Sequence, residues 1–224
     1  MPAALVTGAS SGIGQAIAAD LAAQGWDVTA VARRPEGGAP PGAVPLAADV
    51  ATVDGCVRAV REHVERAGRL DLLVTAAGIN LHATVAESGV DVFDEQMAVN
   101  ARGPFLLARE AIPHLLDSRG LIVVVASLMS VEGGAGMGGY AASKHAALGL
   151  VRSLNLELNG RGVRATALCP AFVATPMVLP WATIPAEEMI QTDDVVRIVR
   201  MLVELGPNCV VEELVVLRTG RVQL

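Results

Sequence analysis

The stretch TGASSGIG, residues 7–14, lies between an apolar run, Ala3–Thr7, and a helical pattern that begins at about Gly12. This order predicts a strand, a glycine-rich turn and a helix. The glycines free the backbone for a tight turn and let it approach a bound group closely, while the first N–H groups of the helix face that group. The stretch therefore predicts an anion site, of the kind that holds a pyrophosphate, at the start of an α/β fold.

The rest of the chain alternates strand-like apolar runs with helical patterns, and no internal repeat or long linker divides it. Strands separated by helices of about ten or more residues indicate a parallel sheet. We therefore expect an α/β fold in a single domain spanning residues 1–224, a Rossmann-type doubly wound parallel sheet of about seven strands with helices on both faces. The expected strands are residues 3–7, 27–32, 44–47, 70–75, 121–126, 163–168 and 214–217, and the expected helices are about 12–24, 52–67, 91–117, 140–159 and 192–205.

Composition excludes several classes of protein. The 224 residues are 52% hydrophobic and 18% charged, which excludes a disordered chain. The net charge is -6 and no basic stripe is present, so no nucleic-acid partner is expected. The apolar runs are too short to span a bilayer, and the first residues lack the basic region of a signal peptide, so we expect no membrane association.

Cysteine and histidine usage point to the compartment and to the metal content. Three cysteines without a CxxC spacing favour reduced thiols and a cytoplasmic location. The four histidines form no HxH or HExxH pattern, so no metal site is expected.

Two arginines follow the second expected strand. Arg33 lies 19 residues after Gly14, and Arg34 follows it. In dinucleotide-binding folds a carboxylate about 20 residues on binds the ribose hydroxyl, whereas arginine accommodates a 2′-phosphate. Because guanidinium groups pair with phosphate in bidentate fashion, these residues favour NADP(H) over NAD(H).

Tyr140 and Lys144 lie four residues apart in a helical pattern and so share one helix face. A phenol has a pKa near 10 and is a poor acid–base catalyst at neutral pH, and a neighbouring ammonium is expected to lower that pKa. Ser127 follows the strand-like run 121–126, at the sheet edge where ligands of open α/β folds bind. Its hydroxyl is a candidate hydrogen-bond partner for a substrate carbonyl.

Asn100 is the fourth candidate catalytic residue. It lies in a helical pattern, and Pro104 follows four residues later. Because proline has no N–H, the carbonyl of Asn100 loses its intrahelical partner. We expect this carbonyl to accept a hydrogen bond from a water in a proton relay.

Together these motifs resemble the short-chain dehydrogenase/reductase family, of the ordinary type with a YxxxK pair. The resemblance runs from Ala3 to about Met177 and is carried by TGASSGIG (7–14), Asp49-Val50, Ala77-Gly78, Asn100, Ser127, YAASK (140–144) and CPAFVATPM (169–177).

The resemblance implies reversible hydride transfer between a nicotinamide and a carbonyl or alcohol. It implies that Tyr140 donates or accepts the proton, that Lys144 lowers the pKa of Tyr140 and binds the ribose, that Ser127 polarises the carbonyl and that Asn100 anchors the relay water. Asp49 and Val50 would border the adenine, and Val173 and Thr175 the carboxamide. The implied cofactor residues are Gly8, Ser10, Ser11, Gly12, Ile13, Gly14, Arg33, Arg34, Asp49, Val50, Ala77, Gly78, Tyr140, Lys144, Pro170, Val173 and Thr175.

The sequence departs from the family pattern in places. The usual NNAG is TAAG at residues 75–78, and the usual PG is Pro170-Ala171. In the family these asparagines normally brace the central sheet, so we expect this brace to be weaker here.

Apolar residues around the expected site predict a small, largely neutral or apolar substrate. By analogy the segment 176–187 covers the substrate, and the predicted pocket residues are Leu128, Met129, Met177 and Trp181. The helical pattern 141–158 is apolar around much of its circumference and needs cover beyond the sheet. The family resemblance implies that a homo-oligomer, a tetramer or a dimer, provides this cover.

Two other functions remain open. One is a protein that binds NADP as a sensor or scaffold without turnover; the presence of Ser127, Tyr140 and Lys144 together argues against it. The other is an enoyl reductase, but relatives with that chemistry space the tyrosine and lysine more widely than here.

Overall fold

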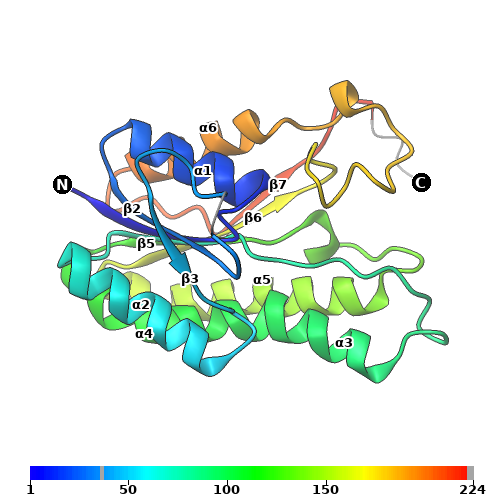
Figure 1. Cartoon of the computed structure of the whole chain (residues 1–224), viewed down its shortest axis with the longest axis horizontal. Helices are drawn as coiled ribbons and strands as arrows, with labels where there is room; N and C mark the ends of the chain where they lie inside the picture. The colour runs from blue at the N-terminus through cyan, green and yellow to red at the C-terminus, as the bar shows by residue number, and fades with distance from the viewer. Residues whose placement is uncertain (36–37, 221–224) are drawn as a thin grey trace.

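The computed structural model of the chain describes residues 1–35 and 38–220, and its strands form one parallel sheet (Figure 1). Within these residues the sheet has seven strands in the order β3-β2-β1-β4-β5-β6-β7, and every neighbouring pair is parallel. The expected doubly wound sheet of about seven strands is confirmed. The last residues of the expected domain, 221–224, lie outside the described part of the chain.

The elements follow the expected alternation, with ends that differ by one or two residues. The strands are β1 Ala3–Thr7, β2 Asp27–Ala32, β3 Val44–Ala47, β4 Leu72–Thr75, β5 Leu121–Val125, β6 Arg164–Pro170 and β7 Glu213–Val216. The helices are α1 Gly12–Ala23, α2 Val53–Ala67, α3 Val90–Met97, α4 Gly103–Ser118, α5 Gly138–Leu158 and α6 Thr192–Glu204, with short turns η1 Ala98–Arg102, η2 Leu128–Ser130, η3 Asn159–Arg161 and η4 Ala186–Glu188.

Helices cover both faces of the sheet, with α1 and α6 on one side and α2, α4 and α5 on the other (Figure 1). Successive strand residues point to opposite faces, so Leu5 packs in the core beneath α2, α4 and α5, while Val6 packs beneath α1 and α6. Strands buried on both faces need apolar residues at every position. This is why the strands read as continuous apolar runs rather than as alternating ones.

The expected single helix over 91–117 is wrong in detail, because a five-residue π-helical turn, η1, separates α3 from α4. Pro104 has no N–H to donate to the carbonyl of Asn100, so the α-helical ladder cannot continue there. The register slips by one residue, and the N–H of Gly103 bonds to the carbonyl of Ala98, five residues back. Such π-turns inside α-helices are frequent at functional sites.

The order of connections determines where a ligand site forms. From β1 the chain moves outward through β2 to β3, and then crosses back so that β4 pairs with the other side of β1. The loops after β1 and β4 therefore diverge at the carboxyl edge of the sheet. In open α/β sheets the binding crevice lies at this switch point.

A buried histidine lies on α2, away from this edge. His63 is fully buried; its Nδ1 lies 2.7 Å from Thr29 Oγ1 and its Nε2 lies 3.1 Å from the carbonyl of Arg69. Because a carbonyl only accepts, Nε2 carries the proton and Nδ1 accepts from the threonine hydroxyl. Burial, and then the nearby charge of Arg66, lower the pKa of His63 from 6.5 to about 4.

This histidine makes stability depend on pH. Between pH 6.5 and 4 the unfolded chain binds a proton that the folded chain does not, so the free energy of unfolding falls as the pH falls. The loss from His63 is about 3 kcal/mol over this window. Denaturant unfolding at several pH values, with wild type and His63→Gln, measures it. The variant is expected to lose less stability between pH 6.5 and 4 than wild type, and equal losses in the two proteins would contradict the account.

Candidate active site

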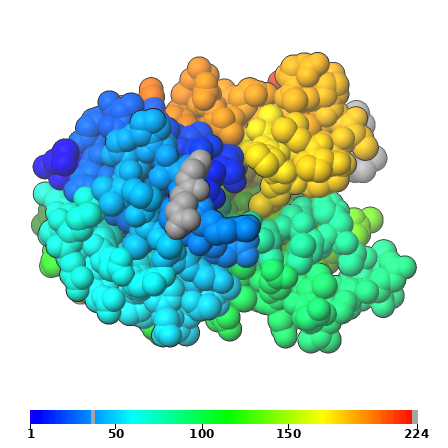
Figure 2. Space-filling view, in the orientation of Figure 1, coloured from blue at the N-terminus to red at the C-terminus, as the bar shows by residue number. Residues whose placement is uncertain are grey.

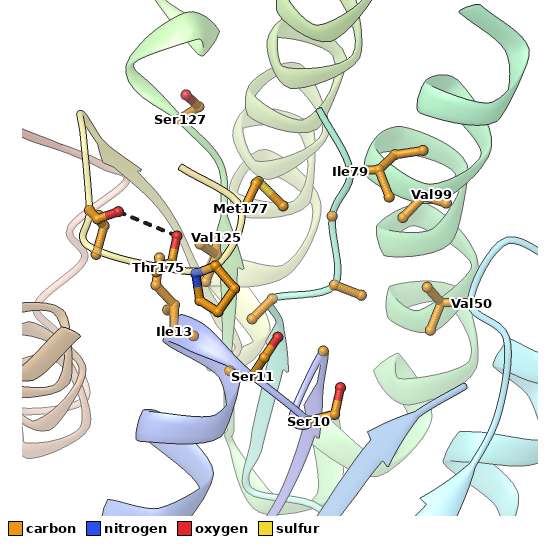
Figure 3. Close-up of a pocket in the computed structure, with 18 of the residues that line it drawn as sticks. Ser10, Ser11, Ile13, Val50, Ile79, Val99, Val125, Ser127, Thr175 and Met177 are labelled. Atoms are coloured by element: carbon orange, nitrogen blue, oxygen red, sulfur yellow. Dashed lines mark hydrogen bonds between the residues drawn. The ribbon is translucent and has the colours of Figure 1, made fainter. Parts of the chain in front are cut away.

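Loops that follow β1 to β6 surround a cavity of about 270 Å³ at the carboxyl edge. The space-filling view is hollowed where the blue N-terminal segment meets the yellow segment after β6 (Figure 2). The close-up places Ser10 and Ser11 at one end of the cavity and Ser127 at the other (Figure 3). The cavity is therefore elongated along the sheet edge, from the glycine-rich turn to the end of β5.

The glycine-rich turn lines the cavity with bare backbone. Gly8 has a φ of +67°, and a Cβ there would lie 2.7 Å from the backbone nitrogen of Ala77. At Gly14 a Cβ would lie 2.5 Å from the carbonyl oxygen of Gly8. Larger residues at either position would clash with backbone, so the glycines allow both the tight turn and the close approach of a ligand.

Among the described residues, no side chain caps the N-terminus of α1. Ser11 precedes the helix in an extended conformation, its side chain makes no capping hydrogen bond, and the first turn contains no acidic residue. In contrast, α2 is capped by Thr52, whose hydroxyl accepts from the N–H of Gly55 at 3.0 Å. The free N–H groups and the helix dipole of α1 suit an anion at the cavity. The turn and this helix end fit the pyrophosphate of a dinucleotide.

The cavity gathers the predicted cofactor residues from six loops. Arg34 is the exception: it is exposed and lies outside the lining. Arg33 lies at the rim, exposed, and forms no ion pair with any residue in 1–35 or 38–220. The predicted residues that line the cavity are Gly8, Ser10, Ser11, Gly12, Ile13, Gly14, Arg33, Asp49, Val50, Ala77, Gly78, Tyr140, Lys144, Pro170, Val173 and Thr175.

Ser127, Tyr140 and Lys144 meet at the far end of the cavity. The hydroxyl of Ser127 accepts a hydrogen bond from the N–H of Met129 at 3.1 Å, which leaves its own proton free to donate. Lys144 is buried; its Nζ donates to the carbonyl of Val125 at 2.9 Å and lies 5.7 Å from the centroid of the Tyr140 ring. The pair on α5 thus reaches the cavity beside the end of β5.

Burial shifts both members of the pair. Burial raises the pKa of Tyr140, and its contact with the Ser127 hydroxyl opposes this only in part. Burial also lowers the pKa of Lys144 from 10.5 to about 8. The expectation that the Lys144 ammonium lowers the pKa of Tyr140 does not match this arrangement, because Nζ turns to the carbonyl of Val125 and desolvation dominates.

Asn100 is buried in η1, behind the cavity wall rather than in its lining. Its Oδ1 accepts from the N–H of Ile79 at 2.9 Å, and its Nδ2 donates to the carbonyl of Ile79 at 2.8 Å and to Ser143 Oγ at 3.0 Å. The side chain therefore joins the loop after β4 to α5. The water expected on its carbonyl remains a prediction.

The loop after β4 carries the departure from the family pattern. Thr75 pairs within the sheet, but its hydroxyl is buried and has no partner among the described residues. The position therefore supplies no side-chain brace of the expected kind, and Asn100 is the amide that anchors this loop.

A smaller side pocket of about 90 Å³ opens beside Ser127 and Tyr140. All four predicted substrate-pocket residues, Leu128, Met129, Met177 and Trp181, line it. Sequence reasoning missed Asn80, Met137 and Phe172, which also line it. Phe172 could have been predicted from its position between the predicted site residues Pro170 and Val173. No motif distinguishes Asn80 or Met137.

Residues 1–35 and 38–220 contain no group of three or more His, Cys, Asp or Glu side chains placed to hold a metal ion. None of their helices combines the length and the apolar character that crossing a membrane requires.

Residues 2–183 match the short chain dehydrogenase family. The chain is 38% identical over 192 residues to 2-(R)-hydroxypropyl-CoM dehydrogenase of Xanthobacter autotrophicus, covering 78% of this chain and 75% of that one. It is 32% identical to meso-2,3-butanediol dehydrogenase of Serratia marcescens, covering 79% and 73%. An alcohol dehydrogenase from the archaeon Thermococcus sibiricus, solved with 5-hydroxy-NADP, superposes with a TM-score of 0.88 at 29% identity and covers 100% of both chains.

The family match, the relatives, the parallel sheet and the glycine cradle agree, and this fold binds a nicotinamide cofactor. The chain belongs to the short-chain dehydrogenase/reductase family and is an oxidoreductase.

Proposed function

We propose that the protein transfers a hydride reversibly between NADP(H) and a carbonyl or secondary alcohol of a small, largely neutral or apolar substrate. The observation that carries the proposal is the shared cavity: the glycine cradle lies at one end, and Ser127, Tyr140 and Lys144 lie at the other. Ser127 and Tyr140 line both the cavity and the side pocket, so a dinucleotide held along the cavity would meet the substrate beside these residues. The relatives named above, a butanediol dehydrogenase and an alcohol dehydrogenase among them, support the same class of reaction.

When bound, the cofactor supplies the hydride in reduction and accepts it in oxidation. The protein's part is to place the carbonyl and to move one proton. Ser127 donates a hydrogen bond to the carbonyl oxygen, and Tyr140 delivers the proton to that oxygen as the alcohol forms. In the other direction Tyr140 takes the proton back.

Lys144 acts as the proton source for Tyr140. Its pKa of about 8 lets it exchange a proton near neutral pH, while the buried phenol alone is a weak acid. Ribose hydroxyls bound at Lys144 would draw Nζ into hydrogen bonds at the cavity. Thr175, whose hydroxyl donates to the carbonyl of Val173 at 3.3 Å (Figure 3), keeps acceptor capacity for the carboxamide.

We further propose a homo-oligomer in the cytoplasm. On α5, Ala142, Ala146 and Leu156 are exposed, and Leu156 is 90% exposed, while on α4 Phe105 is 52% exposed. A second copy of the chain would cover these residues. All three cysteines are free, which suits a reducing compartment.

Tyr140→Phe removes the proton donor and keeps the ring. We expect it to lower kcat by ~100-fold or more, because general acid–base groups contribute on that scale. Binding of NADPH should be unchanged. The assay is loss of reduced-nicotinamide absorbance with small ketones, aldehydes, diketones and quinones. Retained turnover would remove Tyr140 from this role, and NADPH binding without turnover by wild type across the panel would favour the sensor or scaffold function.

Arg33→Ala is expected to weaken NADPH binding by about ten-fold and to leave NADH binding nearly unchanged, because it removes a charge-assisted bond to the 2′-phosphate. Arg34→Ala is the matched control, since Arg34 is exposed but outside the cavity lining. Dissociation constants for both cofactors, measured by fluorescence titration, give the ratio. A loss in Arg33→Ala that is equal for NADPH and NADH would contradict the proposed NADP preference.

A further inference from the structure

Of the residues that the structure describes, Asn80 is the one with an amide side chain that lines the side pocket. It lies between β4 and α3, and its Oδ1 is buried with no hydrogen-bond partner among the described residues. Around it the pocket wall is made of thioethers and aromatic rings: Met129, Met137, Met177, Phe172 and Trp181. Burying a hydrogen-bond acceptor without a donor destabilises a folded protein. Within the described part of the chain, the Oδ1 atom of Asn80 therefore still lacks a hydrogen bond that would be favourable.

The backbone on both sides of Asn80 is held in place. The N–H and the carbonyl of Ile79 both bond to the side chain of Asn100, at 2.9 Å and 2.8 Å. The N–H of Leu81 donates to Oε1 of Gln96 at 3.1 Å. Asn100 and Gln96 are themselves buried, each about 1% exposed. These two amides hold the main chain in place on both sides of Asn80.

Ser127 and Tyr140, the groups that bind the carbonyl in the proposed function, also line the side pocket. A ligand that satisfies all three residues therefore has a carbonyl oxygen at Ser127 and Tyr140, a hydrogen-bond donor at Asn80, and an apolar skeleton against the thioethers and rings. Among the described residues no carboxylate lines the pocket, so the donor is a neutral hydroxyl rather than an ammonium. The volume of about 90 Å³ suits a skeleton of a few carbons.

We propose that Asn80 determines specificity by accepting a hydrogen bond from a substrate hydroxyl, and that the substrates are compact hydroxy ketones and the corresponding diols. This inference rests on the proposed function, because it takes the carbonyl site from Ser127 and Tyr140. It adds the second point of recognition, at which ketones with a hydroxyl group are separated from ketones of the same size without one.

The test uses pairs of ketones in which a hydroxyl replaces a methyl: hydroxyacetone with butan-2-one, 3-hydroxybutan-2-one with 3-methylbutan-2-one, and 4-hydroxybutan-2-one with pentan-2-one. In wild type, kcat/KM for the hydroxy ketone is expected to exceed that of its partner by about ten-fold or more in at least one pair. In Asn80→Leu, which replaces the amide with an apolar group of similar size, this ratio should fall to about one or below.

Two controls separate recognition from structure. Met129→Leu changes the same pocket without altering its polar groups, so it should scale both members of each pair alike. Asn80→Leu should unfold at a temperature equal to or higher than wild type, because it removes an unpaired buried acceptor. Asn80→Ala gives a second reading of the ratio if the leucine variant does not fold.

The outcomes are distinct. Turnover of both ketones with no preference in wild type, or with a preference that Asn80→Leu and Asn80→Ala retain, overturns the inference and leaves the proposed function standing. Absence of turnover with every ketone in wild type overturns the proposed function and the inference with it.

Discussion

A single buried amine is the constraint on which the site depends. Lys144 is the one lysine of the chain, it is 5% exposed, and its Nζ bonds to the carbonyl of Val125 at the end of β5. An amine buried in this way needs fixed polar partners, because it has lost most of its contact with water. That requirement ties α5 to the sheet edge, and it places Tyr140, one turn earlier on the helix, beside Ser127 and the cavity.

The loop after β4 also lies against Lys144. At Gly78 a Cβ would lie 3.3 Å from Oδ1 of Asn100 and 3.6 Å from Nζ of Lys144, so a side chain there would crowd Asn100 and contact Lys144. Asn100 then fixes Ile79, and Ser143 links Asn100 to α5 through a hydroxyl that also donates to the carbonyl of Tyr140 at 2.7 Å. The loop, η1 and the start of α5 are therefore joined by one connected set of buried polar contacts.

Much of this could be predicted from the sequence, because its main determinants are local. Apolar runs, glycines at a strand–helix junction and the four-residue spacing of Tyr140 and Lys144 act over a few residues, and they predicted the sheet and the residues that the cavity brings together. The length of a helix through Pro104 could not be predicted in the same way. The sequence shows that Pro104 lacks an N–H. The change to a π-turn, however, depends on which carbonyl accepts the next main-chain hydrogen bond.

Properties that depend on tertiary burial were not accessible from sequence. Spacing alone implied that Lys144 lowers the pKa of Tyr140, whereas desolvation of the phenol dominates once both groups are buried. The separation of Arg33 from Arg34 depends on which of two adjacent side chains reaches the rim. Asn80 has no sequence signature, because its significance comes from an unpaired oxygen in a pocket formed by distant segments.

Burial lowers the pKa of Lys144 into the range in which the amine exchanges a proton near neutral pH, and the proposed proton transfer depends on this shift. Because the chain has one lysine, incorporation of ¹³C-lysine gives a single Cε signal, and its NMR titration reports the protonation of Lys144 alone. The account predicts a midpoint at about pH 8. A midpoint at or above the ordinary lysine value of 10.5 would contradict it, because the amine would then be a fixed cation at neutral pH rather than a group that exchanges its proton.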